Sequence, residues 1–128
     1  MIDELLRPEF NRHLIGAVFV LAGLLHFWKP AFYVRIMPDY IPWHKAMVYL
    51  SGAAEIAGGI GMFVPLVRFE AAIGLILLLL AVFPANIDMA IKSIQKRGWI
   101  SLYSMLMILR LPLQFVLIYW VYWAAIMH

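Results

Sequence analysis

Two oppositely charged residues lie inside apolar stretches of this sequence and are the first candidates for chemistry. Glu55 is the only charged residue between positions 46 and 67, and Arg110 is the only one between positions 103 and 126. An ionisable side chain at the centre of a bilayer costs roughly 2.5–3.5 kcal/mol on insertion scales, and such residues usually face neighbouring helices and pair with one another. We therefore expect Glu55 and Arg110 to meet inside a helical bundle.

Three further polar residues fall at similar depths if the apolar stretches are membrane spans. At 1.5 Å per residue, Glu55 lies about 13 Å and Arg110 about 10 Å from the span ends that adjoin the loop at 29–45. Asn86 lies roughly 7–8 Å from the same face, and Gln114 lies one turn deeper than Arg110. His26 is expected near the mouth. These five residues predict an intramembrane pocket.

Several kinds of chemistry fit this set poorly. A guanidinium beside Glu55 competes with a divalent cation, so no metal site is predicted, and haem would need a second buried histidine. No nucleophile–base triad or glycine-rich phosphate loop is present. An acid–base pair of Glu55 and His26 remains an alternative, although His26 is expected two to three turns nearer the mouth. A purely structural role, in which the polar cluster sets helix register, is the other alternative.

The composition is that of an integral membrane protein. The chain has 128 residues, of which 66% are hydrophobic and 13% charged, a balance that a soluble surface would not tolerate. The net charge is +3, but the ten Lys and Arg residues flank apolar blocks, which argues for topology signals and lipid contacts and against nucleic-acid binding. The sequence contains no cysteine, so thiol–disulfide chemistry is excluded.

The apolar blocks predict a single membrane domain over residues 1–128. A helix that crosses the ~30 Å hydrocarbon core needs about 20 residues, and four stretches qualify. We expect an all-α, four-helix bundle with spans at about 10–28, 46–67, 71–91 and 103–126. The last helix could instead begin near Leu111, with residues 99–109 as a separate interfacial piece. The first span shows no cleavage pattern of a secretory signal and is expected to be retained.

The connections between these spans suggest an orientation. The loop at 29–45 contains Pro30, Pro38 and Pro42 among aromatic residues, so we expect no continuous helix there and a segment at headgroup depth over the bundle end. A tight loop is expected around Arg68. The first and third loops carry six Lys and Arg residues against three on the opposite face. This excess favours a cytoplasmic long loop with both termini extracytoplasmic.

Short motifs spread from Gly23 to Trp123 resemble the DoxX family of small bacterial membrane proteins. The motifs are His26-Phe27 before Pro30, Met37-Pro38 with Ile41-Pro42, Ser51-Gly52, Glu55-Ile56 with Gly58-Gly59, Val82-Phe83-Pro84-Ala85-Asn86, Arg110-Leu111-Pro112-Leu113-Gln114 and Trp120. The resemblance implies a four-helix, multi-pass protein of the bacterial cytoplasmic (inner) membrane. It also implies a link to membrane oxidoreductase or oxidative-stress complexes, without a single catalytic mechanism.

Taken together, these observations predict a membrane protein that binds a hydrophobic small molecule, such as a quinone or a lipid, and serves a redox or stress system. Glu55, Arg110, Gln114, Asn86 and His26 are the expected ligand-binding residues. A quinone is the candidate cofactor because such side chains can bond its carbonyls while leucines hold its tail. The expected partners are the lipid bilayer and a homo-oligomer or a membrane oxidoreductase. We expect a chain that is not a stand-alone enzyme.

Overall fold

The computed structural model describes residues 2–37, 39 and 41–127, so Pro38 and Tyr40 of the predicted interfacial loop lie outside the described residues. The helices are α1 (Ile2–Leu5), α2 (Pro8–Trp28), α3 (Pro30–Ile36), α4 (His44–Gly61), α5 (Arg68–Arg97) and α6 (Leu102–Tyr122), which continues into the π-helix η1 (Trp123–Met127). Over these ranges the chain forms no strand, and the all-α prediction is confirmed.

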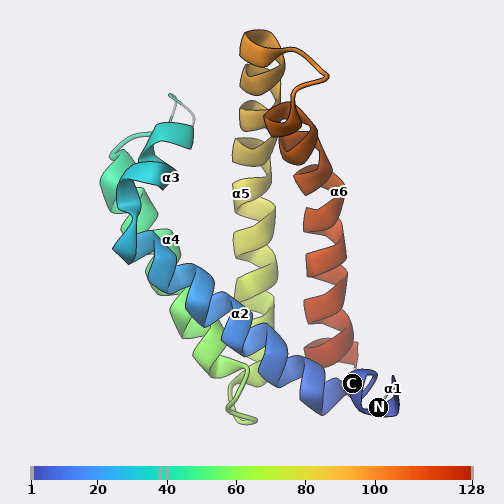
Figure 1. The fold of residues 1–128 in the computed structure, drawn as a ribbon. Helices are drawn as coiled ribbons and strands as arrows, with labels where there is room; N and C mark the ends of the chain where they lie inside the picture. Colours follow the sequence, from blue (N-terminus) through green and yellow to red (C-terminus); the bar gives the residue numbers. More distant parts are fainter. Residues whose placement is uncertain (1, 38, 40, 128) are drawn as a thin grey trace.

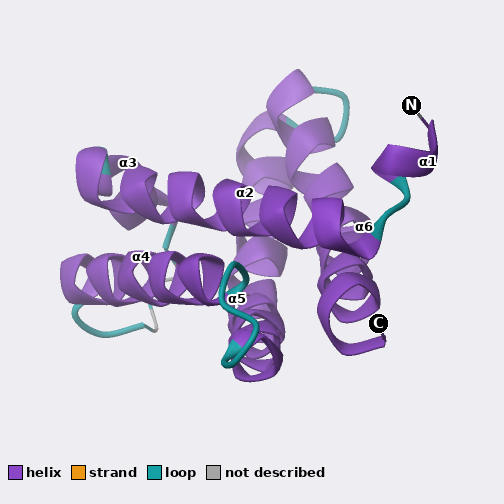
Figure 2. Ribbon diagram, turned by 90° about the horizontal axis from the view of Figure 1, so that it is seen from below, coloured by secondary structure: helices purple, strands orange, loops and turns teal. Residues whose placement is uncertain are grey.

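The long helices form two hairpins. Helix α2 packs chiefly on α4, and α5 packs chiefly on α6, while α4 and α5 join the two pairs. Figure 1 shows the α2–α4 pair inclined against the α5–α6 pair, so that the hairpins meet near the chain ends and spread apart near α3. Seen along α5 and α6, helices α2 and α4 run side by side across them (Figure 2).

Three of the described helices are long and apolar enough to cross a membrane: Pro8–Trp28, Arg68–Arg97 and Leu102–Met127. Many of their large hydrophobic side chains point outward, including Leu21, Leu77 and Val116, each at least 60% exposed. Outward apolar side chains suit a lipid environment. Helix α4 is not in this group, because His44, Lys45 and Glu55 lower its average hydropathy. The fourth crossing therefore stays a prediction.

Several predicted boundaries differ from the structure. Helix α4 ends at Gly61, not at position 67, and the turn occupies residues 62–67 because Arg68 already begins α5. The Nε of Arg68 donates to the carbonyl of Met62 at 2.8 Å and closes this turn. Helix α6 is continuous from Leu102 through Pro112, so the alternative start near Leu111 is wrong. Pro30 is the first residue of the short helix α3. A backbone N–H at that position has no partner within the helix, so the missing N–H of proline costs no hydrogen bond.

Pairs of glycines set the distance between α2 and α4. A Cβ atom added to Gly23 would lie 2.6 Å from the carbonyl oxygen of Gly52, and one added to Gly59 would lie 2.7 Å from that of Gly16. Both distances are too short for any other residue without a shift of the backbone. The two helices therefore touch backbone to backbone at two points, as small-residue rows permit in membrane helices.

The hydrophobic core lies at the end where the hairpins meet. Arg12 Nε donates to the carbonyl of Ala124 at 2.6 Å, and Trp120 Nε1 donates to Asn11 Oδ1 at 2.8 Å, which ties α2 to the end of α6. The core therefore fixes one end of the molecule. Its buried cluster comprises Ile15, Phe19, Met62, Ala72, Leu75, Leu79, Val121 and Ala124.

Candidate functional site

The structure brings His26 and Glu55 together. His26 lies in the last turn of α2 and Glu55 near the middle of α4, and the Gly23–Gly52 approach places the two helices in direct contact beside them. The Nδ1 atom of His26 lies 3.2 Å from Glu55 Oε2. The expectation that His26 lies two to three turns nearer the mouth is therefore wrong.

The reason for this error lies in the path of the chain after Trp28. Depth was counted from the end of the first apolar stretch, but the chain continues as α3 and turns only after residue 37. His26 lies eleven residues before Met37, and Glu55 lies twelve residues after Trp43. The two side chains are thus nearly equidistant from the turn, which places them level with each other.

The surroundings of His26 define which ring nitrogen carries a proton. Nδ1 lies 2.8 Å from the carbonyl oxygen of Ala22 and 3.2 Å from the Glu55 carboxyl. Both neighbours are acceptors, so we assign the proton to Nδ1. The ring stacks on Tyr33 of α3, with centroids 3.9 Å apart and planes 17° from parallel. Nε2 is the ring atom left to exchange a proton or bind a ligand.

Glu55 is only partly satisfied in this arrangement. Its Oε2 is within ion-pair distance of His26, yet among the described residues it has no hydrogen-bond partner. The Nδ1–H group is directed mainly at the Ala22 carbonyl, which is the shorter contact. A buried carboxyl oxygen without a full hydrogen bond is costly, by about 1–3 kcal/mol, and is typical of binding and proton-transfer sites.

Tyr33 is the third residue of the cluster with His26 and Glu55, and its role was not predicted from the sequence. Burial raises the pKa of its phenol, the charge of Glu55 raises it further, and the charge of Arg110 lowers it. The phenol is therefore protonated at neutral pH and available as a donor. The sequence signal was Pro30, which allows a helix to begin directly after α2 and returns an aromatic ring to His26.

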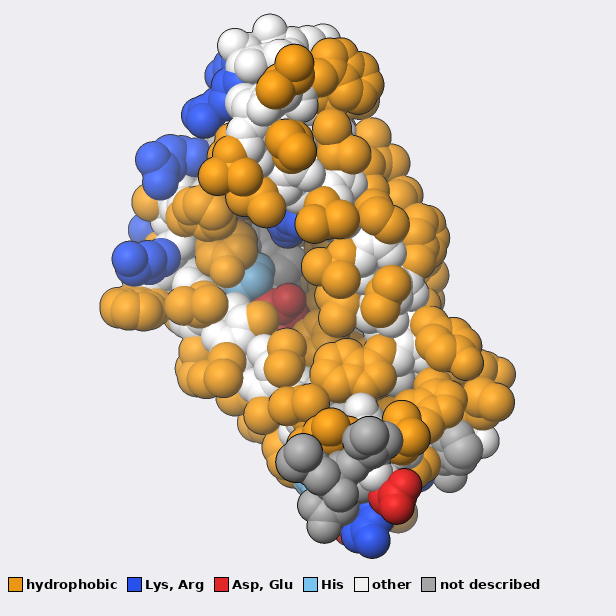
Figure 3. All heavy atoms as spheres, turned by 45° about the vertical axis from the view of Figure 1, so that its right-hand side comes forward, with side chains coloured by type: hydrophobic (Ala, Val, Ile, Leu, Met, Phe, Trp, Pro, Cys, Tyr) orange, Lys and Arg blue, Asp and Glu red, His pale blue; other side chains and the backbone are white. Residues whose placement is uncertain are grey.

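Arg110 does not form the predicted ion pair with Glu55. Its side chain is exposed, and its Nη1 lies 3.9 Å from the sulfur of Met107. Gln114, one turn further along α6, is the residue turned into the helix interface. Arg110 nevertheless acts electrostatically on Tyr33 across the opening between the hairpins. In Figure 3 one face is hollowed, and acidic, histidine and basic side chains lie close together in the hollow, ringed by hydrophobic ones.

Asn86 and Gln114 form a separate, structural pair. Both are buried, and Asn86 Nδ2 donates to Gln114 Oε1 at 3.2 Å. Gln114 Nε2 donates to the carbonyl of Leu79 at 2.6 Å. That carbonyl lies in the turn before Pro84, whose missing N–H would in a regular helix bond to the neighbouring carbonyl of Leu80. Four of the five predicted residues therefore fall into two clusters, with Arg110 in neither, and Asn86 and Gln114 join α5 to α6.

The described residues contain no group of three or more His, Asp or Glu side chains placed to hold a metal ion. What the fold defines is a helical protein with three helices able to cross a membrane and a His26–Glu55–Tyr33 cluster at the edge of the opening between its hairpins. The model of a family described as "Domain of unknown function (DUF8561)" matches residues 15–125. The chain belongs to this family. No curated protein and no solved structure is significantly similar to it.

Proposed function

We propose that this chain is a multi-pass protein of the bacterial inner membrane that binds a hydrophobic small molecule with a polar head, a quinone or a lipid, in the opening between its hairpins. The proposal rests on one observation, the 3.2 Å contact of His26 with a Glu55 oxygen that is otherwise unsatisfied. The large apolar exposure of the helices supplies the route by which a ligand tail enters from the bilayer.

A quinone head fits the donors and acceptors of this cluster. The Tyr33 hydroxyl and the Arg110 guanidinium are donors suited to quinone carbonyls, whereas His26 Nε2 and Glu55 Oε2 can accept from quinol hydroxyls. Reduction of a quinone takes two electrons and two protons. The cluster holds and passes protons, and a membrane oxidoreductase partner supplies the electrons. The role is thus accessory to a redox or stress system, in keeping with the DoxX resemblance, which stays a prediction.

A second candidate is an enzyme that carries out acid–base chemistry on an apolar substrate. The observation that favours it is the same contact, because a carboxyl and an imidazole within 3.2 Å can act as paired base and acid. The two candidates differ in turnover. Conversion of a substrate by the purified chain alone, lost in both His26→Gln and Glu55→Gln, would replace the binding role by the enzymatic one.

The third candidate is a scaffold or assembly protein in which the polar clusters serve packing only. The Asn86–Gln114 pair is of this kind, because its polar atoms bond one another and a backbone carbonyl. In a scaffold, Glu55→Gln and His26→Gln would each reduce the yield of folded protein, and combining them would restore part of it. A ligand site predicts normal folding of both variants with weaker binding.

The direct experiment combines extraction with titration. Protein purified in mild detergent is extracted with organic solvent and analysed for quinones and lipids by mass spectrometry. A reduced short-chain ubiquinone, whose hydroxyl groups can donate to Glu55, is then titrated against tryptophan fluorescence. We expect Glu55→Gln to weaken its binding at least tenfold, the loss of one hydrogen bond to a charged group.

Glu70→Gln is the matched control, since it makes the same chemical change at an exposed glutamate in the first turn of α5. Its affinity for the quinone should equal that of the wild type. Equal affinity in Glu55→Gln and Glu70→Gln, or no binding by the wild type, would remove quinone binding at this cluster.

A further inference from the structure

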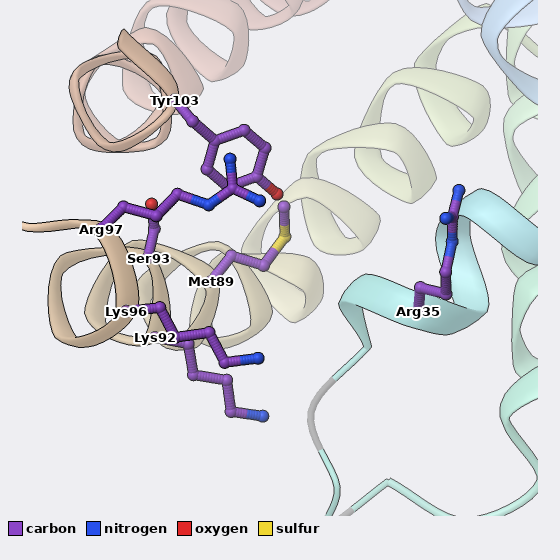
Figure 4. A pocket seen from close by; sticks show the side chains of 7 residues that line it. All are labelled: Arg35, Met89, Lys92, Ser93, Lys96, Arg97 and Tyr103. Atoms are coloured by element: carbon purple, nitrogen blue, oxygen red, sulfur yellow. The ribbon is translucent and has the colours of Figure 1, made fainter. Parts of the chain in front are cut away.

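Four basic side chains lie around a pocket at the far end of α5, apart from the His26–Glu55–Tyr33 cluster. Arg35 comes from the last turn of α3, and Lys92, Lys96 and Arg97 come from the last two turns of α5. The pocket has a volume of about 130 Å³. Figure 4 shows the α5 side chains on one side of it and Arg35, on α3, on the other side. The pocket therefore bridges the hairpins where they spread apart.

Most of this positive charge is not neutralised by the protein. Lys92 Nζ lies 3.0 Å from Asp88 and 3.7 Å from Asp39. Among the described residues no carboxylate lies within 4.0 Å of Arg35, Lys96 or Arg97. The lining thus has a net charge of about +2 once both aspartates are counted against the four cations.

The positions of the cations are partly fixed. The Arg97 guanidinium lies over the ring of Tyr103, 4.4 Å from its centroid, so a residue of α6 holds it in place. A guanidinium held in this way presents its N–H groups as a fork that matches two oxygens of a phosphate. Tyr103 also lines the pocket.

A chain of serine hydroxyls ends at the same pocket. Ser101 Oγ donates to Ser104 Oγ at 2.9 Å, and Ser104 Oγ lies 2.7 Å from Ser93 Oγ. Because Ser104 already accepts from Ser101, it is free to donate to Ser93, which leaves the Ser93 proton for a third partner. Ser93 is 4% exposed and lines the pocket. A buried hydroxyl donor among cations is a feature of anion sites.

We propose that this pocket binds the phosphate group of a phosphate ester, between α3 and the end of α5. The donors are Arg35, Lys96 and Arg97, with the Ser93 hydroxyl beneath them. The ester is either the headgroup of an anionic lipid or a soluble phosphate. The neighbouring turn presents Trp99, Ile100 and Leu102, which are 69%, 91% and 73% exposed, and such side chains enter the acyl region when the headgroup belongs to a lipid.

The test uses the full chain in nanodiscs and in detergent, with two probes. In the first arm, the protein is placed in nanodiscs of phosphatidylcholine that contain about 20% cardiolipin or phosphatidylglycerol. Native mass spectrometry then counts the lipids that the protein retains. In the second arm, glycerol 3-phosphate is titrated in neutral detergent. We expect binding in one arm at least, with Lys96→Gln/Arg97→Gln weakening it more than tenfold and Ser93→Ala weakening it several-fold.

The matched control is Lys29→Gln/Lys45→Gln, which removes the same charge beside the α3 end of the molecule but outside the pocket. Lipid-only binding identifies a headgroup as the source, and glycerol 3-phosphate binding identifies a soluble ester. Equal losses in the two double variants would show general surface attraction and overturn the site, as would the absence of binding in both arms. Ser93→Ala keeps every charge, so its loss of affinity distinguishes a built site from charge alone.

Discussion

His26 and Glu55 face each other because Gly23 and Gly52 allow α2 and α4 to touch. A Cβ atom on Gly52 would lie 2.7 Å from the Cβ of His26 and 3.0 Å from the carbonyl oxygen of Gly23. The contact between the histidine and the carboxylate therefore depends on a hydrogen atom at position 52, where any other side chain would separate the helices. The polar cluster and the packing of the first hairpin cannot be changed independently.

Gly52→Ala should consequently reduce both stability and quinone binding. An added methyl group that must displace backbone and His26 costs about 1–3 kcal/mol. Thermal unfolding in detergent, followed by circular dichroism, measures the loss. Gly74→Ala is the control, because nothing lies within 4 Å of a Cβ atom added there. That variant should be unchanged or slightly more stable, since alanine favours the helix. Equal stability of Gly52→Ala and Gly74→Ala would contradict the close contact.

Gln114→Leu should destabilise the protein without changing ligand affinity. The substitution leaves Asn86 Nδ2 without its acceptor and the Leu79 carbonyl without its donor, at a cost of about 1–3 kcal/mol. Asn86→Leu/Gln114→Leu should recover part of this loss, because no unpaired amide remains. The measurements are the unfolding temperature and a quinone titration of the folded fraction. A loss of quinone affinity in Gln114→Leu would show that Gln114 takes part in ligand binding.

Trp120→Phe should weaken the end at which the hairpins join. The indole donates to Asn11 Oδ1 at 2.8 Å, and Asn11 is only 8% exposed, so its oxygen would lose a buried partner. We expect a loss of about 1–2 kcal/mol in the free energy of unfolding. The same change at Trp99, which is 69% exposed, should have little effect. A similar effect of both substitutions on denaturant midpoints would argue against a structural role for this bond.

Tyr33→Phe should make the protein more resistant to alkali. Burial, and secondly the charge of Glu55, raises the pKa of this phenol, so the folded state keeps the proton longer than the unfolded chain does. The stability that depends on this proton is fully present below about pH 10 and is lost as the pH rises towards the folded pKa. Phenylalanine keeps the ring on His26 but has no proton to lose.

The alkaline midpoint of unfolding provides the measurement, and Tyr119→Phe, at an exposed ring, is its control. The midpoint should rise in Tyr33→Phe and stay at the wild-type value in Tyr119→Phe. A lower midpoint in Tyr33→Phe would mean that the phenol stabilises the folded state in its ionised form.

The helical class and most of the helices could be predicted from the sequence, because long apolar runs leave few alternatives. Asp88 and Lys92, which pair at 3.0 Å, have the i, i+4 spacing that favours ion pairs on a helix. Helix ends were predicted less well. Hydropathy alone continues through residues 62–67, whereas Pro65 and the Arg68–Met62 hydrogen bond turn the chain there.

His26 and Glu55 of the candidate site were singled out in the sequence, whereas Tyr33 was not, and the expected partner of Glu55 was Arg110. Depth along a span and opposite charge both favoured Glu55 with Arg110, yet depth says nothing about rotation around the helix axis. Gln114 and Arg110 are four residues apart on α6. The side chain of Gln114 is buried, whereas that of Arg110 is exposed. The partner of Glu55 is decided by the glycines of α2 and α4, whose role is visible only once the helices are placed together.

The position of Arg110 outside the His26–Glu55–Tyr33 cluster has a practical consequence. Tyr33, His26 and Glu55 belong to the part of the chain before residue 62, whereas Arg110 belongs to α6 and reaches the phenol only through its charge. The influence of the Arg110 charge weakens with distance, so the pKa of Tyr33 depends on how far the two hairpins stand apart. Following tyrosine absorbance while either ligand is added, with Tyr33→Phe to subtract the other five tyrosines, would show without any attached label whether the hairpins close or spread.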